Sequence, residues 1–426
     1  MIKQFFIIAL RNIQKEKFLS SINFLNLIVG FATFILISLF IYGELNWDKH
    51  NKNFDRIYRL QLFMDQPENV IKHTASTTAA LSRHELTTLP EIEKIALIHD
   101  VGDNNKDGVF LSLDRKNQIK VRWGYYADPT VFDIFTFHFL EGDPKKALEE
   151  PFSIVLSKSV AKKLFKDGNA MGKPVYGENK VTFTVKGIYE DLPLNSNWLP
   201  NYLVPINTFT AITGWKDFES AYKSYSFNIY VLLKPNINPE VIDTKIYNAL
   251  KDYRPEHHPY LRPLYQLHIN PYYQKDLSII LIMLSFLAIL ILLLSSINYI
   301  NLQTAKGTSR LKEIGIKKTL GFSKNNLYKQ FLFESVFISF IAGLMGIVAA
   351  QAILPVFNMV IGASGFLGVG ITTNVLSSPL IIIMVIAVSL FTGVISGLYP
   401  AYVISSFNPI RALKEKVLAE KEDLLV

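Results

Sequence analysis

Four apolar stretches dominate the hydrophobic pattern of this chain, over residues 18–45, 277–305, 331–354 and 379–404. Each holds enough apolar residues to cross a hydrocarbon core of about 30 Å, which takes roughly 20 residues. We therefore predict four transmembrane helices. The first stretch is longer than the apolar core of a secretory signal and has no small-x-small cleavage site, so we expect it to remain attached as a membrane span.

The segment 46–276, between the first two spans, has the pattern of a folded domain. Runs rich in Val, Ile, Phe and Tyr predict strands over 56–64, 94–101, 108–121, 153–156, 181–188, 227–234 and 265–270. Helical periodicity occurs around 75–89 and in 239–253. Strand–helix–strand patterns at both ends predict one subdomain built from the two ends, with 102–226 inserted as a second. The predicted fold class is an integral membrane α-helical protein carrying a large mixed α+β extracytoplasmic domain between spans one and two.

Charge sets the expected orientation of these spans. Lys and Arg gather in 1–17, 306–330 and 405–426, whereas 355–378 carries no charge. The positive-inside rule then places both termini and 306–330 in the cytoplasm, and 46–276 outside. The net charge of +8 suggests nucleic acid at first sight, but the basic residues flank membrane spans, so topology and anionic membrane lipid explain them and no nucleic-acid partner is expected. The apolar spacing within 1–17 predicts an amphipathic helix on the inner face, acting as a simple anchor or transmitting force.

Small residues recur inside the third and fourth spans at the four-residue spacing that lets helix backbones approach closely. They are Ala342, Gly346 and Ala350, followed by Gly393 and Gly397. Their partner helices could belong to the same chain or to a second subunit, and the pattern leaves both open. The middle of each span lacks charged residues, which disfavours an ion-coupled transporter. Glu44 and Glu334 fall at span ends, where we expect water nearby.

Motifs for catalysis are missing from the sequence. It contains no GxxxxGK[ST], HExxH, GxSxG or GxGxxG pattern in a suitable context, and the segment Gly315 to Gly321 has one residue too many for a phosphate loop. The absence of Cys excludes disulfides, thiolate zinc sites and a cysteine nucleophile. We therefore predict no catalytic residues, metal or cofactor in this chain.

The segment 298–334 is the most informative part of the sequence. The second span ends in polar residues, a short basic amphipathic helix follows, Gly321 can end that helix, and Ser323 can cap the next one. This pattern predicts a compact cytoplasmic knob. A basic connector that merely holds to anionic lipid is the alternative, and the pattern alone does not separate the two.

Several longer motifs carry a resemblance to a known family. They are Gly43-Glu-Leu-Asn-Trp-Asp-Lys-His, Phe139-Leu-Glu-Gly-Asp-Pro144, Arg310-Leu-Lys-Glu-Ile-Gly-Ile-Lys-Lys-Thr-Leu-Gly321, Gly397-Leu-Tyr-Pro-Ala401 and Asn408-Pro-Ile-Arg-Ala412. With them the chain resembles the FtsX-like permeases of ABC transporters that carry a MacB-like periplasmic core domain. The resemblance implies that the third motif docks on a separate ABC ATPase. The residues expected to couple to that ATPase are Arg310, Lys312, Glu313, Gly315, Lys317, Lys318 and Gly321.

The resemblance further implies a mechanical function in a bacterial inner membrane. In this family an ATPase dimer closes on ATP beneath the coupling helices, and the spans transmit the movement to the periplasmic domain. We expect a permease subunit that exports or extracts an amphipathic substrate such as a peptide, drug or lipoprotein, with ATP used only by the partner. One four-span unit without a fused ATPase should pair with a second copy or a homologous subunit, and a periplasmic adaptor or effector is a further expected partner. The alternative is a signal transmitter that regulates a periplasmic partner such as a cell-wall hydrolase.

Overall fold

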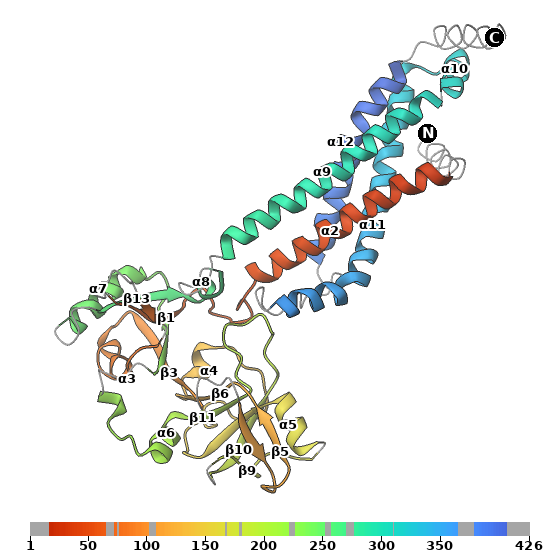
Figure 1. Ribbon diagram of the computed structural model, residues 1–426. Helices are drawn as coiled ribbons and strands as arrows, with labels where there is room; N and C mark the ends of the chain where they lie inside the picture. The colour runs from red at the N-terminus through yellow and green to blue at the C-terminus, as the bar shows by residue number, and fades with distance from the viewer. Residues whose placement is uncertain are drawn as a thin grey trace. The chain divides into compact units, whose positions relative to one another are not determined.

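The chain divides into two compact units, each described separately (Figure 1). The computed structural model describes residues 17–64, 72–74, 76–101, 108–166, 168–178, 181–220, 226–251, 257–269, 277–309, 311–364 and 379–406. One unit, Glu44–Ser278, is called here the sheet unit, and the other, Met1–Gly43 with Ile279–Val426, the helical unit. The helix predicted over 1–17 and the tail predicted over 405–426 lie almost wholly outside the described residues.

The described part of the helical unit contains four helices that are long and apolar enough to cross a membrane, as predicted. They are α2 (Lys17–Leu45), α9 (Leu277–Ser309), α11 (Lys324–Ser364) and α12 (Pro379–Ser406). The third helix is longer than predicted at both ends and runs through Pro355, so the loop predicted to start at 355 was placed too early. A proline removes one backbone hydrogen bond, but membrane helices tolerate this where neighbouring groups satisfy the freed carbonyl.

Two glycines of α12 bring its backbone against α11 of the same chain. A Cβ added at Gly393 would lie 2.6 Å from the Cα of Val336, and one at Gly397 would lie 2.7 Å from the Cβ of Ser335. The hydroxyl of Ser339 adds a hydrogen bond of 2.8 Å to the carbonyl of Ser389. Because this space is already filled from within the chain, the small-residue face of α12 is an intramolecular contact.

The ridge of small residues on α11 lies against α2 in the same way. A Cβ added at Gly346 would lie 2.7 Å from the Cβ of Phe31. Ala342 and Ala350, one turn to either side, are completely buried. Small side chains at this spacing thus hold α11 between α2 and α12.

The sheet unit is built on one mixed sheet in the order β13-β1-β12-β3-β6-β11-β8-β10-β9-β4-β5, with β2 on β1 and β7 on β10. The strands are β1 (Ile57–Met64), β2 (Lys72–Thr74), β3 (Ile92–Asp100), β4 (Val109–Ser112), β5 (Gln118–Val121), β6 (Gly124–Ala127), β7 (Phe139–Gly142), β8 (Ser153–Ser157), β9 (Pro174–Tyr176), β10 (Thr182–Tyr189), β11 (Tyr202–Pro205), β12 (Asn228–Leu233) and β13 (His257–Pro263). The helices around it are α3 (Ala79–Arg83), η1 (Leu86–Thr88), α4 (Val131–Ile134), α5 (Lys158–Phe165), α6 (Ile206–Thr213), η3 (Phe218–Ser220), α7 (Pro239–Leu250) and α8 (Leu264–Ile269).

The segment 102–226 continues this sheet instead of forming a sheet of its own. The two ends of the unit supply β13, β1, β12 and β3, and the inserted segment supplies every strand from β6 onward. The two groups join through the antiparallel pair of β3 and β6, where Ile98 lies opposite Ala127. Neighbouring residues of β8 belong to two different core clusters, Ile154 to one and Val155 to the other. Apolar side chains therefore cover both faces, which explains why the central strands have continuous apolar runs.

Two of the predicted strands need correction. The run 108–121 is a hairpin of β4 and β5, because Asp114 accepts hydrogen bonds from the N–H groups of Lys116 and Asn117 and turns the chain. The strand predicted over 265–270 is wrong, since residues 265–269 lie in helix α8 and the strand, β13, precedes it; residue 270 lies outside the described residues. Leu264 and Leu267 are buried at helical spacing, and a run this short does not distinguish helix from strand.

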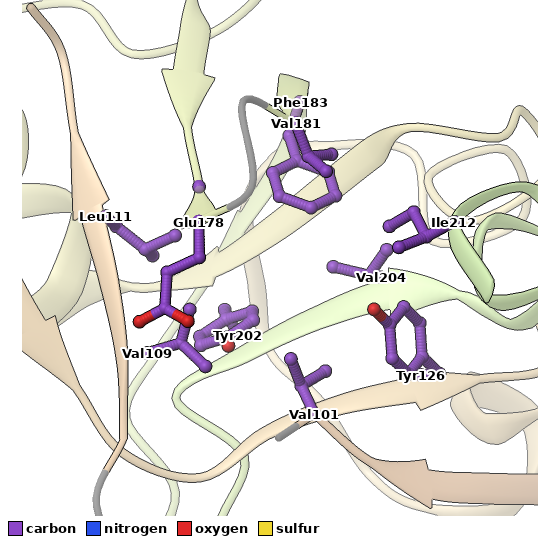
Figure 2. A pocket seen from close by; sticks show the side chains of 11 residues that line it. Val101, Val109, Leu111, Tyr126, Glu178, Val181, Phe183, Tyr202, Val204 and Ile212 are labelled. Carbon is purple, nitrogen blue, oxygen red and sulfur yellow. The ribbon is translucent and has the colours of Figure 1, made fainter. Parts of the chain in front are cut away.

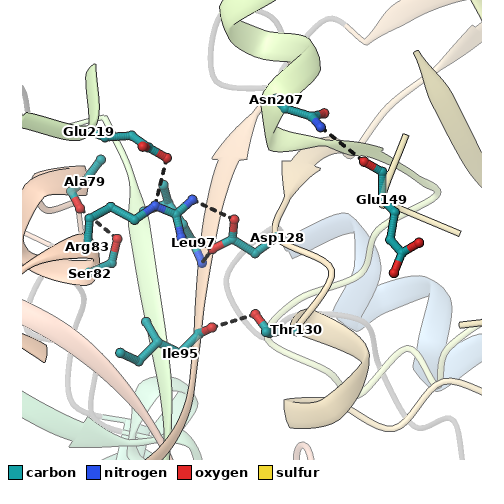
Figure 3. Close-up of polar contacts among 10 residues, drawn as sticks. All are labelled: Ala79, Ser82, Arg83, Ile95, Leu97, Asp128, Thr130, Glu149, Asn207 and Glu219. Carbon is teal, nitrogen blue, oxygen red and sulfur yellow. Dashed lines mark hydrogen bonds and ion pairs between the residues drawn. The ribbon is translucent and has the colours of Figure 1, made fainter. Parts of the chain in front are cut away.

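A polar cluster ties the first part of the sheet unit to the inserted segment (Figure 3). Arg83, at the end of α3, forms a bidentate pair with Asp128, which follows β6, at 2.8 and 3.1 Å. Asp128 also accepts the N–H of Leu97 at 2.8 Å, and Arg83 reaches Glu219 at 2.8 Å. The carboxylate of Asp128 is buried, so the pairing with Arg83 and the hydrogen bond from Leu97 replace the water that it loses on folding.

We expect Arg83→Met to lower the free energy of unfolding of the sheet unit by about 3 kcal/mol, because Asp128 loses its buried counter-charge. Glu219→Gln, at the exposed end of the cluster, should cost less than about 1 kcal/mol. All four tryptophans lie within the sheet unit, so urea unfolding of the full chain followed by tryptophan fluorescence measures this unit. An equal decrease in the free energy of unfolding of the two variants would contradict the claim that the buried Asp128 needs Arg83 as its counter-charge.

A second expectation concerns the helical unit. Gly393→Leu should destabilise the packing of α12 on α11 by about 1–3 kcal/mol, because its side chain meets backbone. Gly43→Leu is the matched control, since a Cβ there meets nothing within 4 Å. Thermal unfolding followed by far-UV circular dichroism in detergent would measure the difference. A variant with unchanged stability but lost dimers would instead assign this face to a subunit interface.

Candidate functional site

Helix α10 (Leu311–Thr319) ends in the sharp reversal that the sequence predicts. Gly321 has φ +90°, where an L side chain would be strained. Its N–H donates to the carbonyl of Lys318 at 3.1 Å, and the N–H of Phe322 donates to the carbonyl of Lys317 at 3.0 Å. These two bonds form a Schellman motif, which satisfies the last carbonyls of the helix.

The next helix, α11, begins immediately after this reversal. The hydroxyl of Ser323 accepts the N–H of Asn326 at 3.2 Å, as a helix N-cap does. The predicted end at Gly321 and the predicted cap at Ser323 are both confirmed. Together they fix the direction in which α10 leaves α11.

The buried side of α10 is anchored to the ends of two membrane helices. Ile314 packs in a small apolar cluster with Leu327, Phe331, Ala401 and Ile404, from α11 and α12. Lys318 Nζ donates to the carbonyl of Ser405 at 2.9 Å, near the C-terminal end of α12, where the helix dipole favours a cation. Lys317 Nζ donates to Gln330 Oε1 at 3.4 Å. These contacts join the ends of α10, α11 and α12 into one body.

Three apolar residues, one in α10 and two in the reversal that follows it, are exposed. Ile316, Leu320 and Phe322 are 60%, 75% and 42% exposed, and we call these three residues the α10 patch. The residues predicted from the sequence were the charged residues and glycines of this segment, and the α10 patch was missed. Its signal was the presence of Leu320 and Phe322 shortly after Ile316 in a basic segment. Exposed apolar residues of this kind mark a surface that contacts another protein or the membrane.

The remaining coupling residues are placed only in part. Arg310 lies outside the described residues. Lys312, Glu313 and Gly315 lie in α10, but the side chains of the first two are not described. Among the described residues, no group of three or more His, Cys, Asp and Glu side chains is arranged to hold a metal ion.

A second polar site joins the two chain ends of the sheet unit. The carboxylate of Glu44 pairs with Nε2 of His268 in α8. The ring of Trp47 stacks on His268, with centroids 3.5 Å apart and planes 6° apart. The side chain of Glu44 is almost completely buried, so our expectation that water surrounds it is wrong: the tertiary contact with α8 covers it.

Asp48 ties the same region to the loop before β11. Its carboxylate accepts the backbone N–H of Asn197 at 2.9 Å and also the side-chain amide of Asn197. The N–H of Asp48 donates to the carbonyl of Asn195 at 2.9 Å. Asp48 is only 2% exposed, and burial, partly offset by the hydrogen bonds from Asn197, raises its pKa from 3.8 to about 6.

This shift gives the sheet unit a defined pH dependence. Because the folded state binds the proton more tightly, the contribution of Asp48 to stability is fully present below about pH 4 and is lost as the pH rises through about 6. Between pH 4 and 7 the unfolding free energy of the wild type should fall by up to about 3 kcal/mol more than that of Asp48→Asn. Urea unfolding followed by tryptophan fluorescence would measure both. If the unfolding free energies of the wild type and of Asp48→Asn changed in parallel with pH, the raised pKa of Asp48 would be contradicted.

Two protein-family models match the chain. The model described as MacB-like periplasmic core domain matches residues 20–248, and the model described as FtsX-like permease C-terminal matches residues 285–409. The macrolide export ATP-binding/permease protein MacB of Neisseria meningitidis serogroup A is 26% identical over 280 residues, which are 65% of this chain and 40% of that protein. The chain thus spans about two fifths of the length of that curated relative.

Two solved structures are similar over half of the chain. A Porphyromonas gingivalis domain described as part of a permease protein has a TM-score of 0.43 at 20% identity, covering 50% of this chain and 91% of that one. The periplasmic region of MacB from Actinobacillus actinomycetemcomitans has a TM-score of 0.36 at 16% identity, covering 50% of this chain and 89% of that one.

Proposed function

Because this chain belongs to the FtsX-like permeases that carry a MacB-like periplasmic core domain, we propose that it couples a separate ABC ATPase to movements of its sheet unit. The sheet unit corresponds to the extracytoplasmic core domain of the family, and the helical unit to its membrane part. In this proposal the α10 patch receives the ATPase. The helical unit transmits the ATP-driven movement, and no substrate passes through it.

The anchoring of α10 is the observation that carries this proposal. A docking helix can transmit force only if it moves together with the membrane helices behind it. Ile314 and Lys318 hold α10 to α11 and α12 by an apolar cluster and a hydrogen bond, while Leu320 remains exposed. A flexible basic connector that only held to lipid would not need the buried anchor to α11 and α12.

The substrate and the second subunit are further parts of the proposal. We propose that the transporter exports or extracts an amphipathic molecule such as a peptide, drug or lipoprotein from the outer side of the membrane. Curated relatives of this chain are named for macrolide export, which supports this chemistry. A second copy or a homologous permease would complete the assembly, since two ATPase sites act together in this class of transporter.

We expect Leu320→Asp to abolish coupling, because a charge in the α10 patch would have to be desolvated against the ATPase. The full chain, purified in mild detergent from its host, should co-elute with an ABC ATPase, and the variant should lose about 90% or more of it, as expected for a lost interface anchor. Leu113→Asp is the matched control, being an exposed leucine of the sheet unit.

Two further readouts complete this experiment. Tryptophan fluorescence should show the same folded sheet unit in wild type and variant, because residue 320 lies in the other unit. ATP hydrolysis by the co-eluted complex should fall with the amount of bound ATPase. Undiminished co-elution and hydrolysis in Leu320→Asp would refute docking at the α10 patch.

A further inference from the structure

A cavity of about 150 Å³ lies in the sheet unit, lined by residues of β4, β6 and β11 and by Gly177, Glu178 and Val181 between β9 and β10 (Figure 2). Its walls are mostly apolar and include Val109, Val181, Phe183 and Val204. An apolar protein cavity of about this volume accommodates a benzene molecule. The cavity therefore has the size and lining for a single aromatic ring or a short branched alkyl group.

One buried hydroxyl in its wall has no hydrogen-bond partner among the described residues. Tyr202 is 1% exposed, and its Oη is unpaired. The ring lies over Gly124, its register partner on β6, where an added Cβ would be 2.2 Å from Oη. Gly124 thus leaves the space that the phenol occupies. Buried hydroxyls nearly always find a partner, so an unpaired one at a cavity wall indicates a partner that the cavity receives.

Two further polar groups converge on the same cavity. Figure 2 shows the carboxylate of Glu178 pointing toward Tyr202 and Val109, with the phenol of Tyr126 on the facing wall. Glu178 Oε1 accepts the N–H of Phe110 at 3.1 Å, which fixes the carboxylate in place. Burial, with added effects of Tyr126 and Glu178, raises the pKa of Tyr202, so its hydroxyl stays protonated and neutral. A neutral hydroxyl and a carboxylate favour a ligand that donates hydrogen bonds and carries positive charge.

We propose that this cavity binds a small amphipathic amine, whose apolar group of about one benzene ring fills the space and whose ammonium group donates to Glu178 and Tyr202. The described residues that line the cavity include no Lys or Arg, so among them nothing would compensate the charge of an anionic ligand facing the carboxylate of Glu178. The proposal goes beyond the function proposed above, because binding here requires no ATPase and involves no residue of the α10 patch.

The test uses the full chain in lipid nanodiscs with benzylamine as the probe. Isothermal titration calorimetry should show saturable binding of benzylamine. The affinity for benzoate should be at least about tenfold lower. Val109→Trp should abolish benzylamine binding by filling the cavity. Val241→Trp is the matched control and should leave benzylamine binding unchanged, because Val241 is an exposed residue of α7 and does not line the cavity. Glu178→Gln should lower the affinity for benzylamine about tenfold and reduce the ratio of the benzylamine affinity to the benzoate affinity.

Each result decides the question, provided that far-UV circular dichroism shows every variant folded. Loss of benzylamine binding in Val109→Trp and weaker benzylamine binding in Glu178→Gln, with unchanged binding in the control variant, support the proposed site. The proposal is overturned if the wild type binds benzylamine and benzoate equally, or if Val109→Trp and Val241→Trp bind benzylamine equally. Absence of saturable benzylamine binding to the wild type would mean that Tyr202 is satisfied by water alone, which also overturns the proposal. Because ATPase co-elution is measured separately, failure here leaves the coupling function standing.

Discussion

The anchoring of α10 to the ends of α11 and α12 is the constraint on which the proposed function depends. Ile314 is buried among apolar side chains of both membrane helices, and Lys318 reaches the carbonyl of Ser405. Backbone geometry reinforces these contacts, since the Schellman motif at Gly321 and the cap at Ser323 leave α10 a single exit direction from α11. In the proposed function, a movement of α10 is therefore transmitted to α11 and α12, because direct contacts hold the three helices together.

The close packing within the helical unit extends that rigidity along the membrane spans. Gly393 and Gly397 bring α12 against α11, and Gly346 brings α11 against α2. At the other end of the mechanism, the sheet unit joins the segments at its two chain ends through Glu44, Trp47 and His268. The two ends of the sheet unit are thus held together at one buried site, and Asp48 ties that site to the loop before β11.

Features set by local chemistry could be predicted from the sequence, and those set by distant partners could not. Apolar runs located the four spans, and Gly321 and Ser323 marked the turn because each needs only its neighbours to act. The contacts of Lys317 with Gln330 and of Lys318 with Ser405 could not be predicted, because these partners are remote in sequence. For the same reason the continuous sheet across 102–226 could not be foreseen, since it depends on the pairing of β3 with β6. The role of the two lysines in coupling to an ATPase stays a prediction.

The central claim is that ATP hydrolysis by a partner moves the sheet unit through α10. The chain has no cysteine, so Lys163→Cys and Asn325→Cys, both at exposed positions, would give one spin-label site on each unit. Double electron–electron resonance in nanodiscs, with the co-purified ATPase, would compare the nucleotide-free and ATP-trapped states. The account predicts a distance distribution that changes with ATP and no longer changes when Leu320→Asp is added. A distribution that ATP leaves unaltered while hydrolysis proceeds would contradict it.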